Sequence, residues 1–312
     1  MKELISSKVN IDFMGKRSIC ALLSLVLVAF SVYKFIQAGD AKYGTDFSGG
    51  YEFLVTFSGN QDSQAVRNGL ASQQLADARV QAFQGTSNQY SIRLGEVGES
   101  SAVQAKVSNA LRAAFGEAAK IEKTDYVGPT VGSELRRSAL IAVALSLVGI
   151  LLYIAIRFEF AIGVGSIVAL AHDVIITTGV YIVSGHQIGM ATLAGALTIV
   201  GYSVNDTVVV FDRVREERKK RRNYDIAQVV NEALNFTLSR TVITHVLTFF
   251  SALALYVIGT GEIKDLSLYL CAGIVCGAYS TIFIVAPIVI MLEKRRAPQT
   301  ASQRVTAQAK TA

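Results

Sequence analysis

The sequence predicts an integral membrane protein, an all-α bundle of six transmembrane helices with one small α+β domain inserted between the first and second spans. Of the 312 residues, 51% are hydrophobic and only 17% are charged, compared with roughly 25% charged in a typical soluble domain. The apolar residues collect in blocks of about 18–25 residues, the length that crosses a hydrocarbon core of roughly 30 Å. A long stretch of mixed polarity separates the first two blocks.

Six apolar blocks are the predicted spans. They are expected to be helices, because a backbone in lipid must satisfy its hydrogen bonds within the segment. The first block has an apolar run too long for a signal-peptide core, and no clear small-x-small cleavage site follows, which favours an uncleaved anchor. The predicted spans are Ser18–Ala38, Ser138–Ile156, Ala161–Val183, Ile188–Phe211, Thr241–Ile258 and Leu266–Leu292.

Lys and Arg residues predict the orientation of these spans. They lie at four places that alternate with two loops holding a single Lys and no Arg between them, so the positive-inside rule puts both termini in the cytoplasm. The four places are the N-terminus 1–17, Arg157, the segment 213–240 and the tail 293–312. We expect the segment 213–240 to be a basic cytoplasmic loop within the five-helix transmembrane region 138–292. The tail after Pro298 is polar, which is typical of disorder.

The stretch 39–137 is then predicted to lie outside the membrane as a folded domain, since about a hundred residues suffice for one. Its acidic and basic residues are nearly balanced. Strands alternating with helices indicate a small α+β domain. The expected strands are Tyr51–Phe57, Arg79–Phe83 and Gln89–Leu94, and the expected helices are Ser63–Leu75 and Ser101–Phe115.

Several function classes find no support in the sequence. The cysteines Cys20, Cys271 and Cys276 lie in apolar blocks and form neither a disulfide framework nor a metal-ligand spacing. We find no phosphate-binding loop and no nucleophile elbow, so we expect no catalytic site, metal or organic cofactor. The net charge of +6 collects beside the spans rather than in a nucleic-acid-binding domain.

Asp206, in the fourth span, is the most informative residue. A charged side chain near the bilayer centre costs about 2.5–3.5 kcal/mol on insertion scales and usually serves a function. Thr198, Tyr202 and Asn205 recur with it at helical spacing, which predicts a polar stripe. A carboxylate in a medium of low dielectric can cycle between its charged and neutral forms, as a proton path requires. The alternative interpretation is a hydrogen-bonding group that fastens helices.

Arg240 and Asp173 are further candidates for this path. Arg240 opens the fifth span, where it is either a counter-charge for Asp206 or a residue that extends its charge to the membrane boundary. Asp173, beside His172 in the third span, is either a relay partner or an acceptor for hydroxyl groups of a neighbouring helix. His245 in the fifth span is expected to pack or to form a hydrogen bond rather than to shuttle protons.

Two further features have simpler interpretations. Gly273 and Gly277 form a Gly-x-x-x-Gly pattern in the sixth span, which predicts close approach of a neighbouring helix. The basic run 218–222 is an orientation signal that can also contact anionic lipid headgroups.

The motifs resemble those of the SecF family, accessory membrane subunits of the bacterial Sec protein translocase. Gly44-Thr45-Asp46-Phe47-Ser48-Gly49-Gly50 resembles the Gly-x-Asp-Phe-x-Gly-Gly signature of that family. Gly49 and Gly50 would permit a turn with positive φ before the first strand, and Asp46 could cap that turn. The other matching segments are Val127–Gly132, Ala171–Val174, Gly201–Arg213 and Leu238–Thr241.

This resemblance implies one half of an exporter fold of the resistance-nodulation-division (RND) type, in the bacterial inner membrane. It implies pairing with SecD, association with the SecYEG channel and with YajC, and contact of the exterior domain with unfolded preprotein. Protons would be the coupling ion, and Asp206 and Arg240 fall on positions associated with the proton path. Ile243 and His245 depart from the family pattern, so the resemblance does not define which residues form the polar face of the fifth span.

Two other functions remain open. A half of a proton-driven small-molecule exporter would use the same intramembrane groups, although such exporters generally have larger exterior domains. A scaffold that stabilises a membrane complex would need Asp206 only for assembly.

Overall fold

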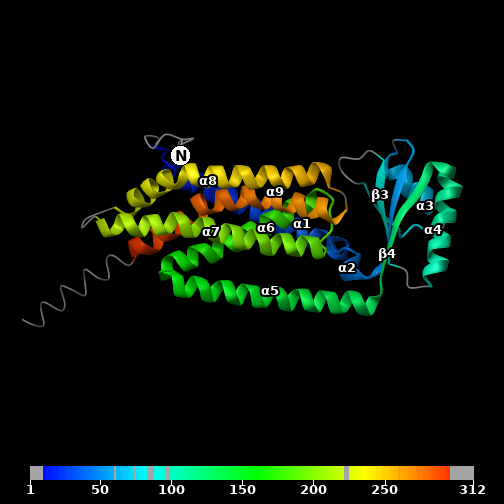
Figure 1. Cartoon of the computed structure of the whole chain (residues 1–312), viewed down its shortest axis with the longest axis horizontal. Helices are drawn as coiled ribbons and strands as arrows, with labels where there is room; N and C mark the ends of the chain where they lie inside the picture. Colours follow the sequence, from blue (N-terminus) through cyan, green and yellow to red (C-terminus); the bar gives the residue numbers. More distant parts are fainter. Residues whose placement is uncertain are drawn as a thin grey trace, which may run out of the picture. The chain divides into compact units, whose positions relative to one another are not determined.

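The computed structural model describes residues 10–59, 61–73, 75–82, 88–95, 99–220, 225–259 and 261–295. The chain divides into two compact units (Figure 1). The sheet unit comprises Ala38–Val143 and Ile182–Leu193, and the remaining residues form the helical unit. The outer parts of the predicted cytoplasmic ends, residues 1–9 and 296–312, lie outside the described residues, as do residues 221–224 of the basic loop and Phe83 of a predicted strand.

The sheet unit contains a four-stranded antiparallel sheet of order β2-β3-β1-β4. Its chain order is that of a split β-α-β-β-α-β fold. Helices α3 and α4 lie on one face of the sheet (Figure 1). The elements are α2 Thr45–Ser48, β1 Gly50–Phe57, α3 Ser63–Ala71, β2 Arg79–Ala82, β3 Gln89–Leu94, α4 Ser100–Phe115 and β4 Ala119–Val127.

Alternation along β1 builds the core of this unit. Tyr51, Phe53, Val55 and Phe57 are fully or almost fully buried, because every second side chain of a strand points to the same face. They pack with side chains of α3 and α4 in one cluster. Glu52 points to the opposite face, which α3 and α4 do not cover.

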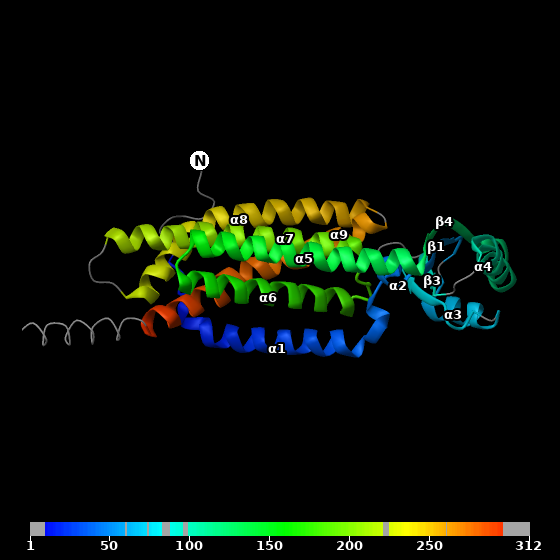
Figure 2. The ribbon, with the colours of Figure 1, turned by 90° about the horizontal axis from the view of Figure 1, so that it is seen from below.

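The helical unit is built from six helices that are long and apolar enough to cross a membrane. They run alongside one another (Figure 2). Helices α5 and α7 begin in the sheet unit and continue into the helical unit. The six are α1 Arg17–Gln37, α5 Pro129–Arg157, α6 Phe160–Val183, α7 Met190–Lys220, α8 Ile226–Ile258 and α9 Glu262–Ser280, and the last continues through a π-helical turn, Thr281–Val285, to Arg295.

Helix α1 packs through small polar residues. Ser24 and Ser31 are its buried positions, and the Oγ of Ser24 lies 3.0 Å from the Tyr279 hydroxyl. A Cβ at Gly179 of α6 would lie 2.2 Å from the Ser31 Oγ, so the two helices approach closely there. The long apolar side chains of α1, such as Leu22 and Leu25, remain exposed, as expected of a face turned to lipid or to another protein.

The predicted basic loop 213–240 is wrong as a loop, because most of it is helix. Helix α7 continues to Lys220 and α8 begins at Ile226. Arg213 forms ion pairs with Glu216 and Glu217 one helical turn away, which stabilises the extension of α7. The α8 extension begins at an N-cap, since the Asp225 carboxylate accepts a hydrogen bond from the Ala227 N–H.

Two differences concern the sheet unit. Strand β4 was not predicted, because charged residues occur throughout its exposed, edge-forming sequence. Helix α3 ends at Ala71 rather than Leu75. Strand β1 and helix α4 lie within one residue of their predicted bounds, and β3 coincides with its prediction.

Candidate functional site: two buried carboxylates

Asp206 is a buried carboxylate with a free acceptor. Its side chain is 7% exposed, and Oδ1 accepts a hydrogen bond of 3.2 Å from the Thr241 hydroxyl of α8. Its Oδ2 is buried and has no hydrogen-bond partner among the described residues. A buried polar atom without a partner is unusual and indicates a strain, a function or a missing ligand.

Arg240 and His245 surround Asp206 without forming an ion pair with it in the described structure. Both lie near this carboxylate, and Arg240 lies near enough for its charge to act on it. Arg240 is exposed, and it is the following residue, Thr241, that contacts Asp206. The His245 Nδ1 donates a hydrogen bond of 2.8 Å to the Thr241 carbonyl, and its ring packs edge-on against Tyr202, in agreement with its predicted packing role.

Asp173 is fully buried and, unlike Asp206, well supplied with hydrogen bonds. Its Oδ2 accepts hydrogen bonds from Ser203 of α7 at 2.8 Å and from Ser280 of α9 at 2.7 Å. Its Oδ1 lies 3.1 Å from the Nδ1 of His172. Asp173 therefore connects three helices, which favours the interpretation as a hydroxyl acceptor over that as a relay partner.

The two carboxylates lie on neighbouring parts of one polar seam. The Thr207 hydroxyl, next to Asp206 in the chain, lies 3.3 Å from the hydroxyl of Thr281. Thr281 follows Ser280 and opens the π-helical turn of the last span. Such turns occur frequently at functional sites, because they change which side chains a helix presents to its neighbours.

Sequence reasoning did not identify Ser203, Ser280, Thr207 or Thr281 as members of this seam. Single hydroxyl residues are common in membrane helices, so their type alone carries little signal. Their spacing could have identified two of them, since Ser280 and Thr281 continue, at helical spacing, the small-residue pattern that begins with Gly273 and Gly277.

The predicted polar stripe of the fourth span divides into two faces. Asp206 is buried between helices, whereas Thr198 and Asn205 are exposed. Tyr202 lies between the two faces and donates a hydrogen bond of 3.2 Å to Thr248 of α8. From Arg240 onward, the exposed polar residues of α8 are Arg240, Thr244 and Ser251. Together with Thr198 and Asn205 they form what we term the exposed polar face.

The signature residues lie in the sheet unit. Gly49 and Gly50 have φ of 73° and 113°, which confirms the predicted turn before β1. Gly44 is buried, and Phe47 is half-buried. Asp46 does not cap this turn, since its Oδ2 accepts a hydrogen bond from the Met190 N–H instead.

The two glycines of the last span differ in how closely α7 approaches them. A Cβ at Gly273 would lie 1.8 Å from the Ile199 Cδ1, so only glycine fits the present packing. A Cβ at Gly277 would lie 3.5 Å from the Ser203 Cβ, an ordinary contact. The predicted close approach is confirmed at Gly273.

Glu52 is a third carboxylate with an ordered environment, on the uncovered face of the sheet. Burial opposes its ionisation, but the ion pair with Arg93 and hydrogen bonds from Arg93, Ser91 and Thr45 outweigh burial and lower the pKa of Glu52. The Glu52–Arg93 distance is 2.8 Å.

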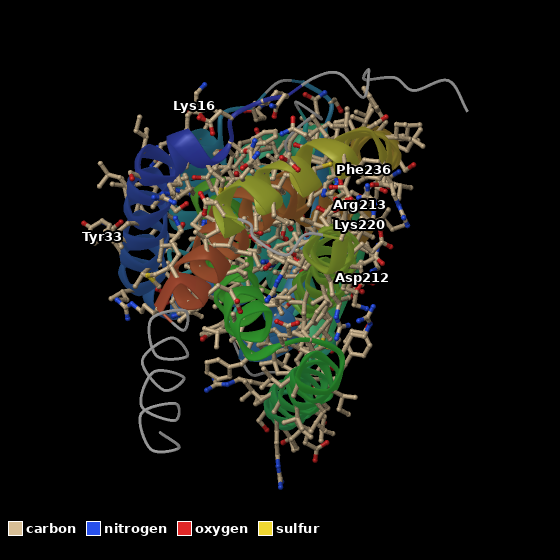
Figure 3. The ribbon with its side chains drawn as sticks, turned by 90° about the vertical axis from the view of Figure 1, so that its left-hand side faces the viewer. Lys16, Tyr33, Asp212, Arg213, Lys220 and Phe236 are labelled. Atoms are coloured by element: carbon tan, nitrogen blue, oxygen red, sulfur yellow. The ribbon has the colours of Figure 1, made fainter. Side chains whose placement is uncertain are left out.

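Charged side chains at one end of the helical unit connect several helices. Arg157 forms an ion pair with Asp212, and Arg218 contacts Glu159 and Glu293. The Arg213 guanidinium stacks 3.6 Å from the ring centroid of Phe236 (Figure 3). These contacts hold the extended ends of α7 and α8 in place.

Comparison with known proteins gives a consistent result. A family model described as the C-terminal part of the protein export membrane proteins SecD and SecF matches residues 106–295. The protein translocase subunit SecF of Calditerrivibrio nitroreducens is 36% identical over 94% of this chain and 98% of its own length. SecF of Petrotoga mobilis is 38% identical over 92% of this chain and 97% of its own.

Two solved structures resemble the chain in fold and sequence. SecDF of Thermus thermophilus, a translocon-associated membrane protein, matches with a TM-score of 0.83 at 33% identity over 93% of this chain. A SecDF in a super-membrane-facing form matches with a TM-score of 0.69 at 34% identity. The present chain spans 40% of each of these SecDF chains.

Proposed function

The chain belongs to the SecF family of protein translocase subunits, and from that premise we propose that it uses the proton motive force to assist late steps of preprotein translocation. In this proposal it acts with SecD and YajC at the SecYEG channel, in the bacterial inner membrane with both termini in the cytoplasm. It acts without enzymatic chemistry or a cofactor, and protons are the coupling ion. The exterior domain contacts the unfolded preprotein.

The observation that carries the proposal is the free oxygen of Asp206. A carboxylate in a membrane helix marks an ion path or an interior contact. The Oδ2 atom is buried and has no partner among the described residues, so it can take up a proton or a new hydrogen bond without breaking the bond to Thr241.

The physical cycle has two states. When Asp206 is ionised, it attracts the guanidinium of Arg240, whose charge acts on it already. Protonation removes that attraction and releases Arg240. Because Arg240 lies on α8, drawing its guanidinium toward the Asp206 Oδ2 and releasing it again rotates or shifts α8 against α7, which gives the two arrangements that a switching element requires.

The exposed polar face supports a membrane partner of the SecD type. Arg240, Asn205 and Thr244 would face hydrocarbon in an isolated chain, at a large cost in desolvation. A second helical bundle that covers this face would supply hydrogen-bond partners or enclose water. The SecDF proteins to which this chain is similar are more than twice its length, which leaves room for such a second half.

The test is preprotein translocation into membrane vesicles that contain the full translocase, with and without a proton gradient. We expect Asp206→Asn to abolish the gradient-driven component at unchanged complex abundance. Glu262→Gln, which makes the same carboxylate-to-amide change at an exposed residue in the first turn of α9, is the matched control. Unchanged gradient dependence in Asp206→Asn would contradict the proposal.

The two alternative functions make different predictions in the same assay. A structural scaffold predicts that Asp206→Asn lowers complex abundance and both components of translocation together. A small-molecule exporter half predicts gradient-driven efflux of an added compound, with translocation unaffected.

A further inference from the structure

The signature segment meets the start of α7 at a junction within the sheet unit. The Gly44 N–H donates a hydrogen bond of 2.9 Å to the Ile188 carbonyl, and the Ile188 N–H donates one of 2.7 Å to the Lys42 carbonyl. Tyr43 and Ile188 form a parallel β-bridge. The chain before the sheet is therefore paired, backbone to backbone, with the segment that leads into α7.

Asp46 caps α7 from a distant part of the sequence. Its Oδ2 accepts a hydrogen bond of 2.8 Å from the N–H of Met190, the first residue of that helix. The first N–H groups of a helix have no partner within the helix, and a carboxylate there also interacts favourably with the helix dipole. The residue before α7 is Gly189, which has no side chain to act as a cap.

The packing around this contact leaves room for the Asp46 carboxylate and little else. A Cβ at position 189 would lie 2.6 Å from the Asp46 Oδ2. Glycine at this position therefore admits the carboxylate from the signature segment, and any larger residue would displace it. Two residues 143 positions apart in the chain are thus matched to each other.

The other side of the signature segment is fixed to the sheet. Thr45 donates a hydrogen bond of 3.0 Å to Glu52 of β1, and the Gly49 N–H donates one of 2.9 Å to the Thr45 carbonyl. A Cβ at Gly132, in the first turn of α5, would lie 3.1 Å from the Gly49 nitrogen. Helix α2, which carries Asp46, is therefore held to the start of β1 by these contacts.

We infer that Asp46 is a positioning residue that couples the sheet domain to Asp206 through α7. Asp206 lies 16 residues after Met190 on the same helix, about 24 Å along it at the usual rise of 1.5 Å per residue. A displacement of the sheet domain pulls on the first turn of α7 through the Asp46 cap, and the helix transmits it to Asp206. This inference rests on the proposed proton-coupled function.

The test compares three variants in the full translocase, assayed with and without a proton gradient. We expect Asp46→Ala to lower the gradient-driven component about five-fold, within the range that the loss of a helix cap implies. Asp46→Asn keeps an oxygen acceptor and is an equally good N-cap, so it should retain most of that component. Asp77→Ala removes an exposed carboxylate of the same unit and serves as the control.

Amide hydrogen exchange in the intact complex provides a second measurement. Asp46→Ala should accelerate exchange at the first turn of α7, from Met190 to Leu193, and Asp46→Asn should not. Retained gradient-driven translocation in Asp46→Ala would overturn the inference. An equal loss of the driven and undriven components, or a loss of complex abundance, would also overturn it, because the role of Asp46 would then be structural.

Asp206→Asn, assayed in parallel, separates this inference from the proposed function. If Asp206→Asn removes the gradient-driven component and Asp46→Ala does not, only the coupling role of Asp46 fails. If Asp206→Asn leaves that component intact, the proposed function fails, and the inference about Asp46 falls with it.

Discussion

The two carboxylates buried among the helices differ in how their oxygens are used. Asp173 accepts hydrogen bonds from two serine hydroxyls and lies beside an imidazole. Asp206 accepts one hydrogen bond, and its second oxygen has no partner in the described part of the chain. A fully bonded carboxylate fixes its neighbours in one arrangement, whereas one with a free oxygen can exchange partners. The difference favours a holding role for Asp173 and a switching role for Asp206.

The same substitution at both positions tests this difference most strongly. We expect Asp173→Ala to lower the free energy of unfolding by about 3 kcal/mol, because Ser203 keeps a buried hydroxyl without its acceptor and Ser280 keeps only the longer contact with the Gly277 carbonyl. Asp206→Ala removes one hydrogen bond and should cost about 1 kcal/mol. Unfolding of the full chain by SDS in mixed micelles measures both values. Equal losses at the two positions would remove the distinction.

The glycines of the last span test whether the packing around Asp173 is as tight as its hydrogen bonds imply. Gly273→Ala should cost about 2 kcal/mol, because the new Cβ meets the branched side chain of Ile199. Gly277→Ala, one turn closer to Asp173, should cost less than about 0.5 kcal/mol, since its Cβ makes only ordinary contacts. The same unfolding assay applies. A larger loss of unfolding free energy at Gly277 than at Gly273 would mean that the contacts with Ser203 and Asp173, rather than those with Ile199, limit the packing.

The Ser280 hydroxyl should contribute to stability mainly through Asp173, because its bond to the Asp173 Oδ2 is 2.7 Å long and its second contact, with the Gly277 carbonyl, is 3.2 Å. We expect Ser280→Ala to cost about 1.5 kcal/mol in wild type, the upper end of the range for a hydrogen bond, and much less when Asp173 is already Ala. Ser251→Ala, which removes an exposed hydroxyl of α8, is the control and should be nearly neutral. Additive losses in the Asp173–Ser280 double-mutant cycle would show that the two side chains are not coupled.

The sequence predicted the six spans because their signal is strong, with long apolar blocks and basic residues between them. It predicted the positions of Asp206 and Asp173 for the same reason, since a carboxylate stands out in an apolar block. It could not show that Ser203 and Ser280 converge on Asp173, because that contact depends on how three helices pack. Nor could it show that the Asp46 carboxylate reaches Met190, a contact across 144 positions.

The ends of the helices were predicted less well, for a related reason. Hydropathy marks where a segment enters lipid, but α7 and α8 continue as helices beyond that point. Their extensions are stabilised by charge pairs such as Arg213–Glu217 and by the Asp225 cap, which leave no apolar signal. Strand β4 was missed likewise, since its edge position allows charged residues where a central strand would be apolar.

Glu52 extends the comparison to a carboxylate outside the spans, with a smaller expected effect. Because its pKa is lowered from 4.5 in the folded chain, its ionised form contributes stability that is fully present above pH 4.5 and is lost as the pH falls through the lowered value. We expect amide protection of β1 and β3 in the full chain to fall below pH 4.5. Glu52→Gln should cost about 1 kcal/mol at neutral pH and remove this step.

Glu122→Gln provides the matched control for Glu52, because Glu122 lies on β4 in an exposed ion pair with Lys120. Exposed ion pairs contribute little, so this variant should keep the pH-dependent step of the wild type. If the step persists in Glu52→Gln, another group of the sheet unit causes it. The bonding of Glu52 would then resemble that of Asp173 in geometry but not in its contribution to stability, and hydrogen-bond number alone would no longer separate holding carboxylates from switching ones.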